Sequence, residues 1–412
     1  MRFELHGSRL AALLLIAVLH TGCGASGDDD DAARSADAEP PASGLGGIRR
    51  EDDAKPRPSA PEASPELGFP ASATKNTTRV GGSDPVANAA AVARVVFPSR
   101  SRETRPAAVT LVERSDWRTA ISAAQLMSRP IRAPVLFSQG GALPAATVTA
   151  LKALAPIGAK ELDGAQAIGL GDTAAPPGLK LRRLSGSDYA ARARTIDRLH
   201  AAAAGKPSRA VLIAPAGDPE IAMPAAGWAA KAGSPVLWVR GAAIPAATTA
   251  AIRDHGRPRI YLLGPESAIP RTVSRRLARF GTVRRISGSD AVTTAVAFAR
   301  YADGGFGWNA VDPGHGFVFA RATRPLAAVA AAPLSASGTY GPLLLLSDDQ
   351  RLDQPVRDYL LDVQPGYDSD PVRGVYNHGW LVGDVGSISI DVQSRIDALL
   401  EIQPVNPDQT AP

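Results

Sequence analysis

A repeat of about one hundred residues constrains this chain more than any other feature of its sequence. The seven residues at 182–188, Arg-Arg-Leu-Ser-Gly-Ser-Asp, return almost unchanged at 284–290 as Arg-Arg-Ile-Ser-Gly-Ser-Asp. A looser copy, Arg-Val-Gly-Gly-Ser-Asp, occupies 79–84. A period of this size indicates that one structural unit is used three times. The fold of a single unit should therefore explain most of the chain.

Each copy of the motif has the pattern of a strand end, a tight turn and a helix cap. An alanine-rich segment with helical spacing follows each Gly-Ser-Asp. The Asp is placed to accept hydrogen bonds from the first free N–H groups of that helix, and the Gly offers a permissive backbone at the turn. A structural role alone would explain the motif. The turn and cap residues are Gly82, Ser83, Asp84, Gly186, Ser187, Asp188, Gly288, Ser289 and Asp290.

Short apolar strands alternate with helices along each copy. The second strand of each copy starts at a proline, and its leading residues are Pro134, Val135, Leu136, Pro235, Val236, Leu237, Pro342, Leu343 and Leu344. Continuous apolar strands between helices predict a parallel sheet that is covered on both faces. About four strands per copy predict an α/β fold of three tandem, small, doubly wound domains. Packing in a sheet would by itself explain the proline-led strands.

These elements, repeated three times in one order, resemble the type 2 cell-wall-binding repeat, which is found, usually in threes, on Gram-positive surface proteins. The resemblance covers about 79–403. It implies three Rossmann-like or Toll-like domains in a pseudo-threefold arrangement. It also implies non-covalent attachment to an anionic cell-wall glycopolymer, in which the proline-led strand takes part. The expected repeats are 79–180, 181–282 and 283–403, with a disordered tail at 404–412.

The third copy departs from this pattern. It has Gln354-Pro355 where the other copies have Leu143-Pro144 and Ile244-Pro245, and it carries insertions at about 302–316 and 363–378. We expect no separate effector domain after the repeats, which weakens the view of them as an anchor for something else. Four aromatic residues lie in or beside the insertions, and stacking on sugars or filling a local core would both explain them. They are Trp308, Tyr367, Tyr376 and Trp380.

The first residues have the pattern of an export signal. Arg2 and Arg9 precede an uncharged run from Leu10 to Leu19, which predicts a signal peptide over 1–22. The only cysteine, Cys23, follows Gly22 directly, as in the lipobox of bacterial lipoproteins, although His20 departs from the lipobox pattern. We expect lipidation of Cys23 on the outer face of the cytoplasmic membrane, within the cell wall. An ordinary cleaved signal is the alternative.

Residues 23–78 are rich in Asp, Glu, Pro and Ser and poor in aromatics, which predicts a disordered acidic tether. The whole chain carries a net charge of +5, so the part beyond this acidic segment is more basic still. Such a surplus favours polyanionic partners, although solvated cations are also common. Arginine forks suit phosphate or carboxylate oxygens, and pairing with a nearby Asp is the alternative role. The expected polymer-binding arginines are Arg79, Arg182, Arg183, Arg284 and Arg285.

Signals for catalysis are weak. Residues 169–174 fit the dinucleotide fingerprint Gly-x-Gly-x-x-Ala, but in one copy only and late in the unit, so we expect no nucleotide. Asp368 and Asp370 have the pattern of a solvated loop, and the four histidines beyond the signal lack metal or catalytic spacing. No cofactor, metal, nucleic-acid partner or enzymatic activity is expected.

Two main functions remain open at this point. The first is a non-enzymatic lipoprotein that grips an anionic cell-wall glycopolymer through repeated basic surfaces. The alternative is a solute-binding or scaffolding surface lipoprotein with a ligand cleft between domains. A third hypothesis, a degenerate enzyme, requires convergent polar groups at strand ends. A basic surface repeated in all three copies favours the first, and a single deep pocket favours the second.

Overall fold

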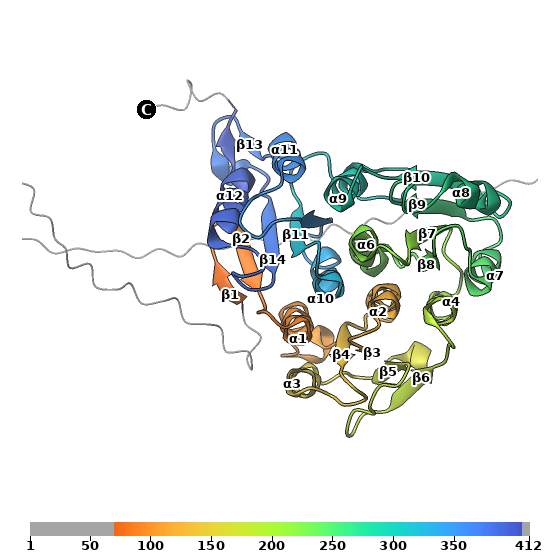
Figure 1. The fold of residues 1–412 in the computed structure, drawn as a ribbon. Helices are drawn as coiled ribbons and strands as arrows, with labels where there is room; N and C mark the ends of the chain where they lie inside the picture. The colour runs from red at the N-terminus through yellow and green to blue at the C-terminus, as the bar shows by residue number, and fades with distance from the viewer. Residues whose placement is uncertain (1–69, 406–412) are drawn as a thin grey trace, which may run out of the picture. The chain divides into compact units, whose positions relative to one another are not determined.

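The computed structural model describes residues 70–405, and the predictions for the signal peptide, for Cys23 and for the tether up to residue 69 lie outside them (Figure 1). Three larger sheets, each with four parallel strands and bordered by helices, and one small two-stranded pair make up the described part. The predicted α/β class is therefore confirmed. Within 70–405, none of the helices combines the length and the apolar character needed to cross a bilayer.

The first two sheets have four parallel strands each. In the first sheet the order is β4-β3-β5-β6. Its strands are β3 (Val109–Glu113), β4 (Val135–Ser138), β5 (Ala167–Leu170) and β6 (Leu181–Leu184). In the second sheet the order is β8-β7-β9-β10. Its strands are β7 (Ala210–Pro215), β8 (Val236–Val239), β9 (Arg259–Leu263) and β10 (Thr282–Ile286). The two sheets thus share one topology.

The third sheet is completed by strands from the start of the described chain. Its order is β12-β11-β14-β2-β1. The strands are β1 (Pro70–Ala73), β2 (Thr77–Val80), β11 (Gly316–Arg321), β12 (Leu343–Leu346) and β14 (His378–Val382). β2 pairs with β14 in parallel, in the position that β6 and β10 hold in their own sheets, and β1 adds an antiparallel strand to β2.

The strand of each Gly-Ser-Asp motif therefore belongs to the sheet of the preceding unit. The expected boundaries before 181 and 283 fall directly in front of β6 or within β10, so they separate these strands from their sheets. The expected tether, which ended at 78, includes β1 and the start of β2. The expected tail, which began at 404, starts inside the small pair β13 (Gly366–Tyr367) and β15 (Gln403–Pro404).

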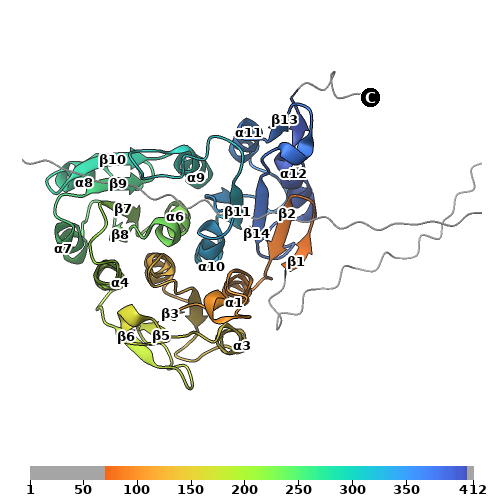
Figure 2. The ribbon, with the colours of Figure 1, turned by 180° about the vertical axis from the view of Figure 1, so that it is seen from behind.

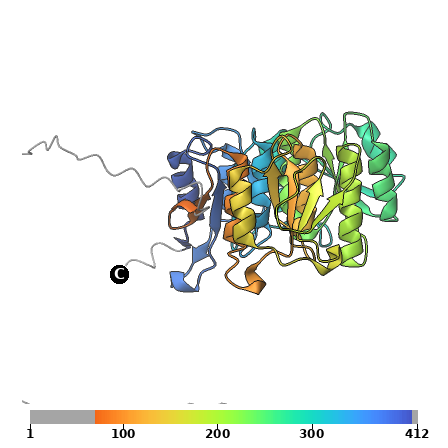
Figure 3. The same cartoon turned by 90° about the horizontal axis from the view of Figure 1, so that it is seen from below.

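Helices cover both faces of the sheets, as the side view of the first sheet shows (Figure 3). The helices that follow the Gly-Ser-Asp motifs are α1 (Pro85–Val96), α4 (Tyr189–Ala204) and α9 (Ala291–Arg300). Small-residue segments follow the first strand of each unit: α2 (Trp117–Ala123) with η2 (Ala124–Met127), α5 (Pro219–Ala222) with α6 (Pro224–Ala232), and α10 (Pro325–Ser335). The remaining helices are α3 (Ala145–Leu154), α7 (Ala246–Asp254), α8 (Arg271–Leu277), α11 (Gln354–Asp362) and α12 (Ile390–Leu400), with short 3-10 turns η1 (Arg102–Thr104), η3 (Lys160–Leu162) and η4 (Pro371–Arg373).

The small-residue helices let the three units pack on one another. Each motif helix packs against the small-residue helix of the preceding unit: α4 on α2, α9 on α5, and α1 on α10. α6 and α10 also lie side by side between the sheets, in contact with η2 (Figures 1 and 2). Alanine makes this close approach possible because its side chain adds little bulk. Buried side chains of all three units form one continuous core, so the expectation of separate small bodies is wrong.

Candidate functional site

The second arginine of each motif holds a loop in place. Arg285 donates to the carbonyl oxygens of Gly264 and Ile269, both at 2.7 Å, in the loop that follows the neighbouring strand β9. Arg183 donates at 2.9 Å to the Thr173 carbonyl, in the loop after β5. These guanidinium groups therefore satisfy backbone acceptors at the ends of parallel strands, and Asp side chains are not their partners.

Arg79, the second arginine of the first motif, makes more of these hydrogen bonds than Arg183 or Arg285. Its side chain is 1% exposed and donates to the carbonyls of Gly383, Asp384 and Ile388 at 2.7–3.1 Å, and to Gln393 Oε1. Burial, partly offset by the charge of Asp384, lowers the pKa of Arg79 to about 10. Arg79 thus lies in the interior of the described fold, away from any surface that a polymer could reach, which contradicts its predicted polymer contact.

The first arginine of the second and third motifs remains at the surface. Arg182 lies 3.6 Å from Asp163 with 38% of its side chain exposed, and Arg284 lies 4.0 Å from Asp303 with 60% exposed. Thr78 occupies this position in the first motif. Exposed ion pairs of this kind contribute little to stability. No basic position is therefore repeated at the surface of all three motifs.

The three Asp residues of the motifs are helix N-caps. Asp84, Asp188 and Asp290 accept from the backbone N–H groups of Val86, Ala191 and Thr293 at 3.3, 2.8 and 2.8 Å. Gly186 and Gly288 act by close approach and not through a left-handed backbone, because a Cβ on either would lie within 2.7 Å of the following helix, whereas a Cβ on Gly82 would meet nothing within 4 Å. The motif thus has a clear structural role in all three units.

The proline-led strands offer no exposed apolar side chains. All residues of β4, β8 and β12 are buried, and so are the prolines before them, Pro134, Pro235 and Pro342. These strands lie at sheet edges. Their side chains nevertheless belong to the continuous core, so the structure places the nine predicted residues of this group in packing positions and not on a binding surface.

One open crevice, with a volume of about 530 Å³, lies between the second and third units. It is lined by residues that follow β7 and β9 and by residues that follow β11 and β12, together with the start of α9. Ligands of doubly wound sheets bind at the carboxyl ends of the strands, which is where this crevice lies. Its position is that of the interdomain cleft expected from the alternative function.

The crevice is acidic. Asp218, Glu220, Asp290 and Asp353 contribute to its lining. Burial, and then the nearby charge of Glu220, raise the pKa of Asp218 above its ordinary value. Burial would also raise the pKa of Asp290, but hydrogen bonds from Thr293 and Ser289 outweigh it, and the pKa is lowered. This lining does not suit a polyanion.

Arginines occupy the corresponding positions between the other units. Between the first and second units, Arg192 pairs with Asp116 at 2.9 Å and Arg118 donates to the Ala216 carbonyl at 2.7 Å. Between the third and first units, Arg324 donates to the Ser83 carbonyl at 3.3 Å, and Arg114 lies 3.9 Å from Asp84. The crevice between the second and third units has Glu220 at the position that Arg118 holds in the first unit. The three junctions therefore have the same backbone arrangement but differ in the charge of their side chains.

The first insertion of the third unit, about 302–316, closes the same junction with aromatic residues. Phe306 stacks on Tyr261 of the second unit with ring centroids 3.6 Å apart, and Trp308 packs edge-on against Trp228. Phe306 is 2% and Trp308 is 8% exposed. These rings fill a core at the junction, so Trp308 is not free to stack on sugars. Trp380 and Tyr367 are half-buried, and Tyr376 is exposed.

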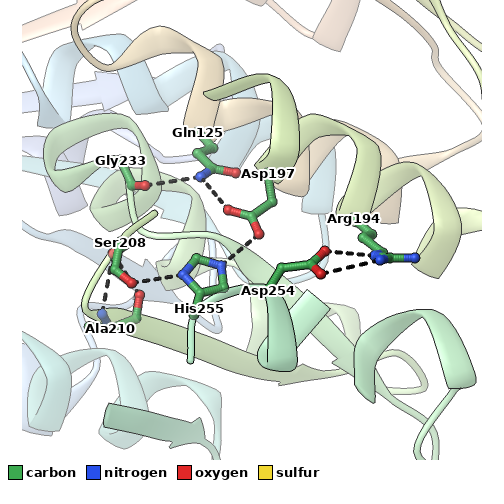
Figure 4. Close-up of polar contacts among 8 residues, drawn as sticks. All are labelled: Gln125, Arg194, Asp197, Ser208, Ala210, Gly233, Asp254 and His255. Atoms are coloured by element: carbon green, nitrogen blue, oxygen red, sulfur yellow. Dashed lines mark hydrogen bonds and ion pairs between the residues drawn. The ribbon is translucent and has the colours of Figure 1, made fainter. Parts of the chain in front are cut away.

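A buried ionic network joins the first two units (Figure 4). His255 Nε2 lies 2.7 Å from Asp197 Oδ2, its Nδ1 lies 2.7 Å from the Ser208 carbonyl, and both side chains of the pair are at most 2% exposed. Gln125 of the first unit donates to Asp197 Oδ1 and to the Gly233 carbonyl. Both ring nitrogens face acceptors, an arrangement that favours the doubly protonated imidazolium and raises the pKa of His255.

The described residues hold neither a group of three possible metal ligands nor a helix directly after the Gly-x-Gly-x-x-Ala fingerprint. Between residues 70 and 405, no three His, Cys, Asp or Glu side chains lie close enough to hold a metal. Gly169 and Gly171 of the fingerprint precede residues 172–180, which form no helix. A dinucleotide site needs the N-terminus of a helix there to receive the phosphates. Asp370 caps the short turn η4.

This chain is similar to known proteins over only part of their length. No family model matches the chain. The chain is 29% identical over 228 residues to the N-acetylmuramoyl-L-alanine amidase LytC of Bacillus subtilis (strain 168), a match that covers 53% of this chain and 41% of the amidase. Among solved structures, it is similar to Cwp8 from Clostridium difficile (TM-score 0.60, 15% identity) and to Cwp6 from the same organism (TM-score 0.63, 16% identity).

Each of the two structural matches covers 79% of this chain, and 52% of Cwp8 or 48% of Cwp6. The chain thus spans about half the length of these proteins, and less than half of the amidase. At this level of identity the likeness establishes the fold: three α/β units with parallel sheets, joined in the order described above.

Proposed function

We propose that this protein is a non-enzymatic cell-envelope lipoprotein, anchored through Cys23, that binds an anionic cell-wall glycopolymer. The observation that carries the proposal is the match of the three-unit fold, over most of the chain, to two C. difficile cell-wall proteins. The similarity of half of the chain to a cell-wall amidase supports the same location. The basic surplus beyond the acidic N-terminal segment supports an anionic partner.

The proposal differs from the sequence-based hypothesis in one respect. Arg79 is buried, Arg183 and Arg285 hold loops, and only Arg182 and Arg284 are left as first arginines at the surface. The structure therefore does not support a polymer contact through the same arginine position in all three motifs. Binding through a basic surface elsewhere on the fold remains compatible with the net charge.

Sedimentation with cell-wall sacculi tests the proposal. The full chain is mixed with purified sacculi that retain their anionic polymer, and with the same sacculi after mild acid has removed it. We expect sedimentation with the first only, and weaker binding as salt rises from about 50 mM to about 500 mM, because salt screens exposed charges. Equal binding to stripped sacculi, or no binding at low salt, contradicts the proposal.

The same incubation tests the absence of catalysis. An amidase that cuts the wall peptide from its sugar releases new amino groups, which can be titrated in the supernatant. We expect no increase over sacculi alone. A steady, enzyme-dependent increase would replace a binding function with a hydrolytic one.

The acidic crevice favours a second candidate function, the binding of a small soluble cation. Its four carboxylates and its place at the strand ends suit a ligand with an ammonium group. A solute that binds only the folded state stabilises it by RT ln(1 + c/Kd), where c is the free solute concentration, so stability rises with that concentration. A melting temperature that rises with millimolar diamines or basic amino acids, and that no longer rises in Asp218→Asn, would favour this function over polymer binding.

A further inference from the structure

The densest positive segment of the chain lies on the second unit. Residues 271–285 contain six arginines and no acidic residue. Four of the six belong to α8 and the turn that follows it, namely Arg271, Arg275, Arg276 and Arg279, and all four are exposed. We call these four residues the α8 basic face.

The α8 basic face points away from the sheet. Val273 and Leu277 are buried, so the helix packs inward through these two positions and carries its arginines on the outer side. Figure 1 shows α8 at the far edge of the second unit, next to β9 and β10. Arg276 donates to the Ala242 carbonyl at 2.9 Å, and Arg253 lies over the ring of Phe280 at 5.1 Å. The first contact joins the face to the loop after β8, and the second joins Phe280, next to Arg279, to α7.

Helix stability explains only part of this concentration of charge. Arg275 and Arg276 lie in the last turn of α8, where cations complement the helix dipole, but Arg271 in the first turn opposes it, and like charges at i, i+4, such as Arg271 and Arg275, repel each other. Glu266 pairs with Arg271 at 2.6 Å, but within the described residues Arg275 and Arg279 form no ion pair. The face therefore carries two cations, Arg275 and Arg279, that no acidic side chain of the described residues neutralises.

The corresponding positions of the other two units are not basic. In the third unit the equivalent helix α12 carries Asp391 and Asp397 beside Arg395. In the first unit no helix forms between β5 and β6. The face is thus specific to one unit, unlike the motif arginines, and the sequence repeat gives no indication of it.

We infer that the α8 basic face is the surface through which the protein contacts the anionic cell-wall glycopolymer, an inference that rests on the proposed function. Arg271 and Arg275 lie about 6 Å apart along α8 at 1.5 Å per residue, and Arg279 follows in the turn after the helix. This spacing lets successive anionic groups of an extended chain engage different arginines. Each guanidinium keeps its positive charge and donates hydrogen bonds to phosphate or carboxylate oxygens, so the contact is mainly electrostatic.

A triple variant of the full chain, Arg271→Gln, Arg275→Gln and Arg279→Gln, tests the inference. The matched control is Arg100→Gln, Lys152→Gln and Lys160→Gln, which removes three equally exposed cations from the first unit. Cations near an anionic surface each contribute several-fold to binding. We expect the α8 variant to bind polymer-bearing sacculi at least about tenfold more weakly at low salt, and the control to stay within about twofold.

Several results overturn the inference. If both variants lose affinity equally, binding depends on net charge and not on this face. If neither loses affinity, the contact lies elsewhere, and the proposed function survives without the inference. If the wild-type chain does not bind polymer-bearing sacculi, both fail. Weaker binding of the α8 variant than of the control to vesicles with anionic lipid, together with unchanged binding to polymer-bearing sacculi, would assign the face to a membrane.

A second variant separates charge from folding. The variant Arg271→Lys, Arg275→Lys and Arg279→Lys keeps the positive charges but loses the planar guanidinium groups. We expect this variant to retain most of the salt-dependent binding and to have the melting temperature of the wild type. A lysine variant that binds as weakly as the glutamine variant, with an unchanged melting temperature, would contradict a mainly electrostatic contact.

Discussion

At the scale of single residues, the arginines of the repeated motif divide into two kinds. The second arginine of each motif supports the loop after the neighbouring strand, whereas Arg182 and Arg284 remain at the surface. Sequence alone could not make this distinction. The acceptors of Arg79 lie more than 300 positions away, at Gly383 to Ile388, and backbone carbonyls leave no residue-type signal. The caps could be predicted because their partners lie within three residues.

Replacing Arg79 should therefore be costly. Arg79→Ala removes the donors of three buried carbonyls and should lower the free energy of unfolding by about 3 kcal/mol. Arg182→Ala, which removes an exposed partner of Asp163, should change it by less than about 0.5 kcal/mol. Urea denaturation of both variants measures the difference. Equal effects would show that the loop does not depend on this guanidinium.

The buried His255 predicts a pH dependence of stability. Burial alone would lower its pKa, but the hydrogen bond and charge of Asp197 and the Ser208 carbonyl raise it above the ordinary 6.5. The folded state then holds the proton more tightly than the unfolded state. The resulting stability is fully present below about pH 6.5 and is lost as the pH rises through the folded pKa.

This dependence can be isolated by comparing the wild type with His255→Gln at several pH values. The wild type should be more stable at pH 6, and its advantage should shrink as the pH rises above 6.5. His200 has a pKa lowered by burial, so its own contribution has the opposite sign, but it is present in both proteins and cancels. An advantage that grows with pH would mean that His255 is neutral in the folded protein.

At the scale of elements, strands and helices in each unit followed from apolar runs, caps and prolines. The packing of the short aromatic insertion could not be predicted from such patterns, because its rings pack on residues of the preceding unit. Phe306 and Tyr261 are stacked although they lie 45 positions apart. From the sequence, these aromatic residues either fill a core or stack on sugars, and only their contacts in the fold distinguish the two roles.

Phe306→Ala tests the role of the insertion as a core between the second and third units. Removing a buried aromatic ring should lower the free energy of unfolding by about 3–5 kcal/mol. Val311→Ala, at a position of the same insertion that is 49% exposed, should have an effect below about 0.5 kcal/mol. Thermal and urea unfolding give both values. A small effect of Phe306→Ala would mean that the insertion packs loosely.

At the scale of the whole described part, the units depend on each other. Each Gly-Ser-Asp strand completes the sheet before it, and β2 at the start of the described chain completes the last sheet. Three copies in sequence therefore do not correspond to three independent domains. The repeat predicted the number of units, but the pairing of β2 with β14 depends on contacts about 300 residues apart that no local pattern encodes.

A pair of truncations tests this dependence. A chain that starts at residue 70 keeps all strands of the third sheet and should unfold in a single transition. A chain that starts at residue 81 lacks β1, β2 and Arg79, leaves an edge of β14 unpaired and should be less stable and prone to aggregate. Equal stability of the two chains would show that the third sheet does not need its N-terminal strands.

The central claim is that this fold holds an anionic wall polymer through surface charge. Calorimetric titration of the purified full chain with polymer released from sacculi measures this most directly. The account predicts saturable binding at about 50 mM salt that weakens at least about tenfold by about 500 mM, as exposed charges are screened. Binding that is absent at low salt, or that is independent of salt, would contradict it.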